Sequence, residues 1–382
     1  MVQRRVTLSE ITVGAPLPWD VFDGQGNLLL GMGATVNDER QMAALIERGL
    51  YAYVPGSDRA RSMRPRSAPS LKREKPSVLR MINQANKRLE QILRNLPNEP
   101  NAEGAILDVA KDIDLAVATN PDIALACILL NQISGMYAVR HCTDTAIVSI
   151  LVARTMQKSA DEIMSISAAA LTMNVSMMAY HDTLQKRESV LTEQEFSIMH
   201  QHPKKAVEAL QQAGIKNRDW LEYVLRHHEN EDGSGYPHGI SGQDIPQNAK
   251  IIALADRYCA RVSARTYRKS WLPNTALRDI FIDQGKSVDS LLASYFIKEL
   301  GLYPPGTFVR LQNQEIGVVT RKGLTATTPV VYAVIGATGG LLPSPIRRDT
   351  GNDNFVIQEA LHEKKLTMRF EMNQLWGEEA NP

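Results

Sequence analysis

The chain has 382 residues, with 43 basic and 42 acidic side chains, a formal net charge of +1 and 43% hydrophobic residues. At ~150 residues per domain, this length predicts two or three folded units with enough chain to bury a core. The balanced charge argues against a protein that coats nucleic acid and against a basic membrane coat, because either would carry a large positive excess.

The cysteines and the apolar stretches indicate the compartment. Cys127, Cys142 and Cys259 show no CxxC spacing, which argues against a disulfide framework and against a structural zinc knuckle. The N-terminus lacks the apolar core of a secretory signal, and the uncharged stretch at 164–180 is too short and too polar to cross ~30 Å of hydrocarbon. We therefore expect a soluble, cytoplasmic protein without a membrane span.

The first part of the chain, residues 1–56, predicts a small β-rich accessory domain. Short apolar runs at 6–13, 21–22 and 28–30 flank a turn-rich Asp-Gly-Gln-Gly segment. Residues 57–76 follow, rich in Arg, Ser and Pro and without an apolar period, which is typical of a solvated basic linker. Binding of a phosphate or another anionic ligand is the alternative for this linker.

The middle of the chain, residues 77–302, predicts a helical domain. Apolar residues recur at helical spacing over 78–96, and the same pattern predicts helices at 106–118, 122–133, 143–156, 162–178, 193–213 and 219–226. Runs at 307–311, 316–320 and 330–335 alternate or are β-branched, which predicts a β-rich extension over 303–382. The expected fold class is therefore mainly α, a helical bundle flanked by two small β elements.

The histidines are concentrated in the helical part. Seven of the eight lie between residues 141 and 238, which makes a metal site the first hypothesis. On a helix, the adjacent His227 and His228 would diverge by ~100° and could serve two cations, or one cation and a phosphate. His200 is expected to be a solvated neighbour of His202. Asp256 lies on an apolar helix, where a charged carboxylate needs a partner.

Four motifs carry a resemblance to one family. HHENEDGSGYPHGI at 227–240 resembles the HHExxDGxGYPxG signature of the HD-GYP family, the bacterial cyclic di-GMP phosphodiesterases of the HD superfamily. Segments YAVRHCTDTA, LTEQEFSIMHQHP and IIALADRYCARVSARTYRKS are similar to its other site motifs. The resemblance covers about residues 130–300, and 303–335 and 14–33 are similar to extensions seen in family members.

The resemblance implies a set of site residues. The metal ligands fall on His141, His202, His227, His228 and Asp256. The ligand-binding positions fall on Gly233, Gly235, Tyr236, Pro237, Arg265 and Arg268. The family's HDxGK motif falls on Met173-Asn174, with Ser176 and Met177 at the Gly and Lys positions, so no catalytic position of that motif is intact. A second pair, His181-Asp182, is expected to lie in a surface loop.

The replaced aspartate bears on the metal count. Two divalent cations about 3.5–4 Å apart repel by about 18 kcal/mol at an effective dielectric near 20, and a bridging carboxylate offsets part of this. Asn174 offers only a neutral oxygen. We therefore expect one divalent ion, Fe, Mn or Zn, rather than a full dinuclear centre.

The expected function follows from the loss of the bridging aspartate. The resemblance implies a bacterial signalling protein with a degenerate HD-GYP domain, whose phosphodiesterase activity is absent or strongly reduced. Such a protein would act as a cyclic di-GMP receptor or, through the GYP loop, as an interaction module for other signalling proteins. The alternative is a residual metal-dependent phosphodiesterase that gives pGpG or GMP. A homodimer is one assembly left open.

Overall fold

The computed structural model describes residues 2–5, 15, 17, 20–23, 28–31, 34–36, 51–54, 76–178, 180, 192–263, 270–283, 288–362 and 371–382. The chain divides into two units, Met1–Arg73 and Glu74–Pro382. No helix among these residues is long and apolar enough to span a membrane. The four-part division predicted from the sequence stays a prediction.

The first unit contains a four-stranded sheet. Its strands are β1 (Val2–Arg5), β2 (Val21–Phe22), β3 (Leu28–Leu30) and β4 (Tyr51–Val54), in the order β1-β4-β2-β3 with antiparallel neighbours. The strands at 21–22 and 28–30 confirm the predicted β character of this part. The strand predicted at 6–13 lies outside the described residues, as does nearly all of the predicted linker.

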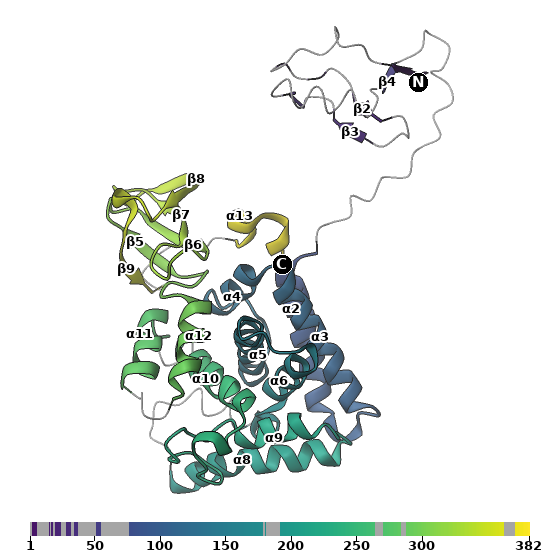
Figure 1. The fold of residues 1–382 in the computed structure, drawn as a ribbon, viewed down its shortest axis with the longest axis vertical. Coiled ribbons are helices and arrows are strands. Elements are labelled where there is room, and N and C mark those ends of the chain that lie inside the picture. The colour runs from purple at the N-terminus through teal and green to yellow at the C-terminus, as the bar shows by residue number, and fades with distance from the viewer. Residues whose placement is uncertain are drawn as a thin grey trace. The chain divides into compact units, whose positions relative to one another are not determined.

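The second unit is mainly helical, which confirms the prediction for the middle of the chain (Figure 1). The helices before the site are α2 (Val78–Arg94), α3 (Ala102–Thr119), α4 (Pro121–Leu129), α5 (Tyr137–Thr155) and α6 (Ala160–Thr172). The helices that follow are α8 (Glu193–Gln212), α9 (Arg218–Arg226), α10 (Gln247–Val262), α11 (Pro273–Arg278), α12 (Ser290–Leu300) and α13 (Asn373–Trp376). Short 3-10 turns lie at Val175–Met177 and Gly242–Asp244, and a π-helical turn lies at Asp279–Asp283.

Helix α5 lies at the centre of the bundle and is buried on nearly every side. It packs against α6, α10 and α3. Two of its buried hydroxyls are hydrogen-bonded: Thr143 donates to Asn86 Oδ1 at 2.7 Å, and Thr145 donates to the His141 carbonyl at 2.8 Å. The helix begins at Tyr137 and not at 143 as predicted, and the additional turns carry His141.

Local sequence sets the helix ends near the site. Capping boxes start α6 at Ser159 and α8 at Thr192, each with a glutamate three residues later that returns the hydrogen bond. Helix α6 ends at Thr172, and a short 3-10 turn follows where the periodicity predicted helix up to 178. Asn174 and the β-branched Val175 favour this early end, because such residues stabilise helix interiors poorly.

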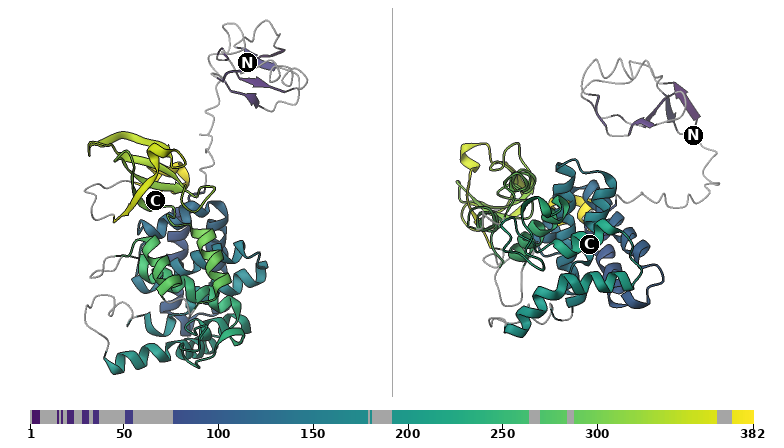
Figure 2. Two further views of the ribbon diagram at one scale, coloured as in Figure 1. Left: turned by 60° about the vertical axis from the view of Figure 1, so that its left-hand side comes forward. Right: turned by 60° about the horizontal axis from the view of Figure 1, so that its bottom comes forward.

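The C-terminal part forms a five-stranded antiparallel sheet, which confirms the predicted β extension. The strands are β5 (Phe308–Leu311), β6 (Ile316–Arg321), β7 (Val330–Ile335), β8 (Leu341–Asp349) and β9 (Ile357–Leu361), in the order β8-β7-β6-β5-β9. The sheet lies at the end of the bundle near α4 and α12, whereas α8 and α9 lie at the opposite end (Figures 1 and 2). An ion pair of 2.8 Å between Lys322 and Glu299 ties the sheet to α12.

Candidate metal centre

Three histidines from two helices meet in one cluster. Helix α8 supplies His202, and the end of α9 supplies His227 followed by His228. One ring nitrogen of each lies within 4.8 Å of those of the other two. His202 and His227 are 2% and 1% exposed, so water has little access to these two rings.

The adjacent histidines correct one expectation from the sequence. Helix α9 ends at Arg226, His227 is its C-cap, and His228 lies in the turn that follows. The ring centroids of His227 and His228 are 4.1 Å apart, so the side chains do not diverge by ~100° as they would within a helix. Both rings therefore belong to the same cluster.

Hydrogen bonds to the backbone determine which ring nitrogens face the centre of the cluster. His202 Nδ1 donates to the Met199 carbonyl at 2.5 Å, and His227 Nδ1 donates to the Val224 carbonyl at 2.7 Å. A neutral imidazole carries one N–H, so the Nε2 atoms of both rings are left with lone pairs. These two Nε2 atoms lie 3.2 Å apart. Two acceptors at this distance repel unless a cation is shared between them, so the donor set fits a metal ion.

Burial also keeps these rings neutral. Burial and the neighbouring His227 lower the pKa of His202 to about 3. Burial likewise lowers the pKa of His227, and lowers that of His228 well below its usual value. At neutral pH the rings are therefore unprotonated imidazoles, which is the form that ligates metals.

The other two predicted ligands form a pair beside the cluster. His141 on α5 and Asp256 on α10 are joined by a contact of 2.6 Å between Nε2 and Oδ1, so the carboxylate has the partner that the sequence led us to expect. Burial would raise the pKa of Asp256, but the hydrogen bond and the charge of His141 hold it well below its usual range. His228 and His227 also contribute to lowering the pKa of Asp256, so the pair lies near the cluster, although only the three histidines have ligand atoms within 4.8 Å of one another.

The glycine-rich loop after His228 is held by the residues that precede it. The buried Glu229 carboxylate accepts the backbone N–H groups of His238 at 2.8 Å and Ile240 at 3.2 Å. The backbone N–H of Tyr236 donates to the His228 carbonyl at 3.1 Å. A Cβ on Gly235 would lie 2.4–2.5 Å from backbone atoms of residues 228–230, so only glycine fits there. Much of the signature therefore serves to fold the loop back onto the histidines.

An aromatic stack connects this loop to α8. The Tyr236 ring lies between His228 and His200, with centroid distances of 4.6 and 4.1 Å and interplanar angles of 27° and 16°. Phe196 contacts the His200 ring at 4.1 Å, with 52% of its surface exposed. Sequence reasoning treated His200 as a solvated neighbour and missed this stack, although Phe196 and His200 have the i, i+4 spacing that puts them on one helix face.

The positions that match the HDxGK motif lie alongside the cluster. The Ser176 hydroxyl donates to the His202 carbonyl at 2.9 Å, and Asn174 is buried against Cys142 of α5. Met173 and Met177 are buried in the apolar core. Residues 173–177 thus offer one amide and no charged side chain. The predicted ligand-binding residues Arg265 and Arg268, and the pair His181-Asp182, lie outside the described residues.

One cation near the site was missed by sequence reasoning. Arg257 follows Asp256 on α10, and its guanidinium donates to the Asn230 side chain in the loop. Burial lowers its pKa, while the charges of Asp256 and Asp232 raise it. Its place next to a predicted ligand on the same helix was the signal that could have identified it.

Comparison with known proteins gives matches to one family model and to several relatives. Residues 129–292 match the family model of the HD domain (HD_5). Over 231 residues the chain is 29% identical to the cyclic di-GMP phosphodiesterase PA4108 of Pseudomonas aeruginosa, covering 60% of this chain and 55% of the relative. Over 143 residues it is 36% identical to the cyclic di-GMP phosphodiesterase response regulator RpfG of Xanthomonas campestris, covering 36% and 37%. The matches thus span about half the length of these relatives or less.

Among solved structures, the chain is similar to Bd1817, a HDG"Y"P protein from Bdellovibrio bacteriovorus. The TM-score is 0.48 at 13% identity, and the match covers 78% of this chain and 98% of the other.

Proposed function

We propose that this chain, which carries an HD domain related to the HD-GYP cyclic di-GMP phosphodiesterases, is a metal-dependent cyclic di-GMP phosphodiesterase of strongly reduced turnover. The observation that carries the proposal is the pair of Nε2 atoms of His202 and His227, which face each other at 3.2 Å with both Nδ1 atoms engaged elsewhere. Such a pair is arranged to share a cation.

The ligand set proposed for the ion is His202, His227 and His228, with Asp256 and His141 beside them. Three nitrogens and one carboxylate suffice to hold one divalent ion, and imidazole suits Fe or Zn better than Mg or Ca. When bound, such an ion polarises a phosphoryl oxygen and lowers the pKa of a coordinated water. His141 keeps the Asp256 carboxylate in place and ionised through the contact of 2.6 Å.

The stack beside the cluster supplies a surface for the substrate. Phe196, His200 and Tyr236 present planar rings next to His228, and their exposed edge at Phe196 faces solvent. A guanine base can stack on such a face, which would place its phosphate toward the histidines. Arg257 adds a positive charge at the edge of the loop, which favours the approach of an anionic ligand.

The reduced rate follows from the residues at 173–177. A second divalent ion has no bridging carboxylate to offset the repulsion of about 18 kcal/mol between two such ions at 3.5–4 Å. Asn174 supplies an amide there, and the buried Met177 supplies no cation to stabilise charge on the transferred phosphoryl group. One ion of the two is therefore expected to be missing, along with its part in generating the nucleophile.

The test is a product assay on the metal-loaded full chain. Cyclic di-GMP is incubated with the protein, and pGpG and GMP are separated by chromatography. Slow product formation that disappears in His227→Ala supports the proposal. The control is His362→Ala, which changes a histidine just after β9, and here product formation should persist. Equal product formation in His227→Ala would assign the activity to a contaminant and contradict it.

A receptor without turnover is the second candidate, favoured by the absence of any charged side chain at 173–177. Calorimetric titration separates the two, because tight binding of cyclic di-GMP with no product after long incubation indicates a receptor. If neither binding nor product is found, the interaction of the GYP loop with another protein is the remaining function.

A further inference from the structure

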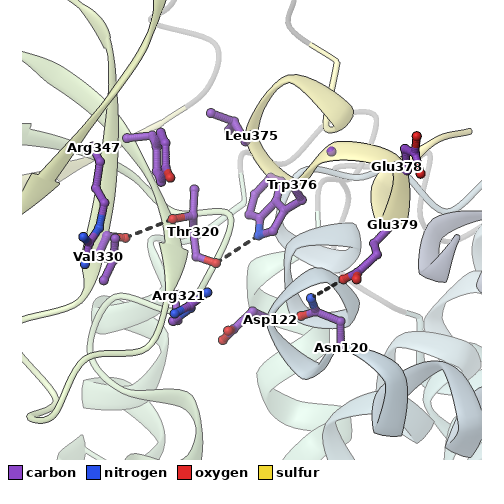
Figure 3. Close-up of a pocket in the computed structure, with 12 residues that line it drawn as sticks. Asn120, Asp122, Thr320, Arg321, Val330, Arg347, Leu375, Trp376, Glu378 and Glu379 are labelled. Carbon is purple, nitrogen blue, oxygen red and sulfur yellow. Dashed lines mark hydrogen bonds between the residues drawn. The ribbon is translucent and has the colours of Figure 1, made fainter. Parts of the chain in front are cut away.

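A cavity of about 640 Å³ lies between the C-terminal sheet and the bundle. It has three walls: the start of α4 with Asp122, the strands β6 to β8, and the C-terminal segment 375–379. Figure 3 shows these walls facing one another, with Trp376 between the sheet and α4. The cavity lies at the end of the bundle opposite to α8 and α9, so it is separate from the histidine cluster.

Two arginines line the cavity, together with the acidic residues Asp122, Glu378 and Glu379. Arg321 ends β6, and Arg347 lies on β8, and both line the cavity. Within the described residues, neither guanidinium forms an ion pair or a hydrogen bond, whereas the neighbouring Arg348 is paired with Glu315 at 2.7 Å. Two unpaired guanidinium groups lining one cavity suit an anion with several oxygens, above all a phosphate.

The other two walls carry a carboxylate, Asp122 at the start of α4, and an aromatic ring, Trp376 in the C-terminal segment. Asp122 Oδ1 accepts the backbone N–H of Lys322 at 3.4 Å, and no described residue hydrogen-bonds its Oδ2. The Trp376 indole N–H donates to the Thr320 carbonyl at 2.9 Å, which holds the ring plane as a fixed wall. Of the other two acidic residues in the lining, Glu379 accepts from Asn120 at 2.9 Å, and Glu378 adds a further negative charge.

We propose that this cavity is a binding site for a guanosine phosphate, distinct from the metal centre and independent of the function proposed for it. Arg321 and Arg347 hold the phosphate oxygens, Trp376 stacks on the base, and Asp122 reads the base edge.

The chemistry of the base selects guanine. Its Watson–Crick edge presents two neighbouring donors, N1–H and the 2-amino group, which one carboxylate accepts together. Adenine presents an acceptor at N1 to the same carboxylate, and this juxtaposition is repulsive. The cavity volume lies within the range of sites for nucleotide-sized ligands, and inorganic phosphate would use the arginines and leave the aromatic wall uncovered.

The experiment is a calorimetric titration of the full chain carrying His227→Ala, so that the metal centre does not contribute. GMP, AMP and inorganic phosphate are the probes. We expect GMP to bind more tightly than AMP or phosphate, and we expect Arg321→Gln with Arg347→Gln to weaken GMP binding about tenfold or more. The matched control is Arg310→Gln on β5, whose guanidinium pairs with Glu359 outside the cavity lining.

Two further variants locate the base. Asp122→Asn should remove the preference for GMP over AMP while phosphate binding stays unchanged, and Trp376→Phe should abolish the change in tryptophan fluorescence that GMP causes. The proposal is overturned if GMP does not bind at millimolar concentration, if AMP binds equally well, or if the double arginine variant binds GMP as the control does.

Discussion

The buried His202 makes the metal-free protein sensitive to acid, and His202→Gln should remove part of that sensitivity. The pKa of this histidine is about 3 in the folded chain, against a usual value of 6.5. The unfolded chain therefore binds a proton below pH 6.5 that the folded chain does not, so stability is present above 6.5 and falls as the pH drops toward 3. Between pH 7 and pH 5 this linkage costs about 2 kcal/mol.

The measurement is urea unfolding with a chelator present, at pH 7 and pH 5, for the wild type and His202→Gln. The free energy of unfolding should fall by about 2 kcal/mol less in the variant. Asp144, whose pKa burial raises to about 6, changes stability in the opposite direction in both proteins and cancels in the comparison. His362→Gln serves as the control and should match the wild type. An equal loss of stability in wild type and His202→Gln would show that His202 does not cause this sensitivity to acid.

Three other substitutions test the surroundings of the site. Gly235→Ala places a Cβ about 2.4 Å from the backbone of residue 230, so we expect a lower melting temperature and weaker metal retention; unchanged values would contradict the described loop. Met173→His combined with Asn174→Asp should raise the metal content to two ions per chain and increase the formation of pGpG; an unchanged metal content would count against the bridging argument. Trp220→Phe removes a fully buried indole donor and should cost about 1–3 kcal/mol in chemical unfolding, whereas no loss would show that its bond is dispensable.

The spacing of apolar residues predicted the helical bundle and three strands of the C-terminal sheet, β5, β6 and β7. It was insufficient for β8, because this strand is mostly exposed and holds Pro343 and Pro345, which hide any alternation of apolar residues. At the site, the expectation that Asp256 needs a partner followed from burial of charge alone, and His141 is that partner.

The geometry of the histidine pair could not be derived from helical spacing. The helix ends one residue before His227, and the end depends on how the loop folds back through Glu229 and Gly235. The stack of His200 on Tyr236 brings together residues far apart in the chain, so local pattern alone does not reveal it. The sequence alone likewise does not show that Gly235 packs against the backbone of residues 228–230, because this contact exists only in the folded loop.

The number of metal ions per chain distinguishes a single-ion site from a dinuclear centre. The purified full chain is loaded with Fe, Mn or Zn in turn, freed of excess metal by gel filtration, and measured by inductively coupled plasma mass spectrometry. We expect one tightly held ion per chain, lost in His227→Ala and retained in His362→Ala. Two ions per chain in the wild type, or one ion that persists in His227→Ala, would contradict this expectation.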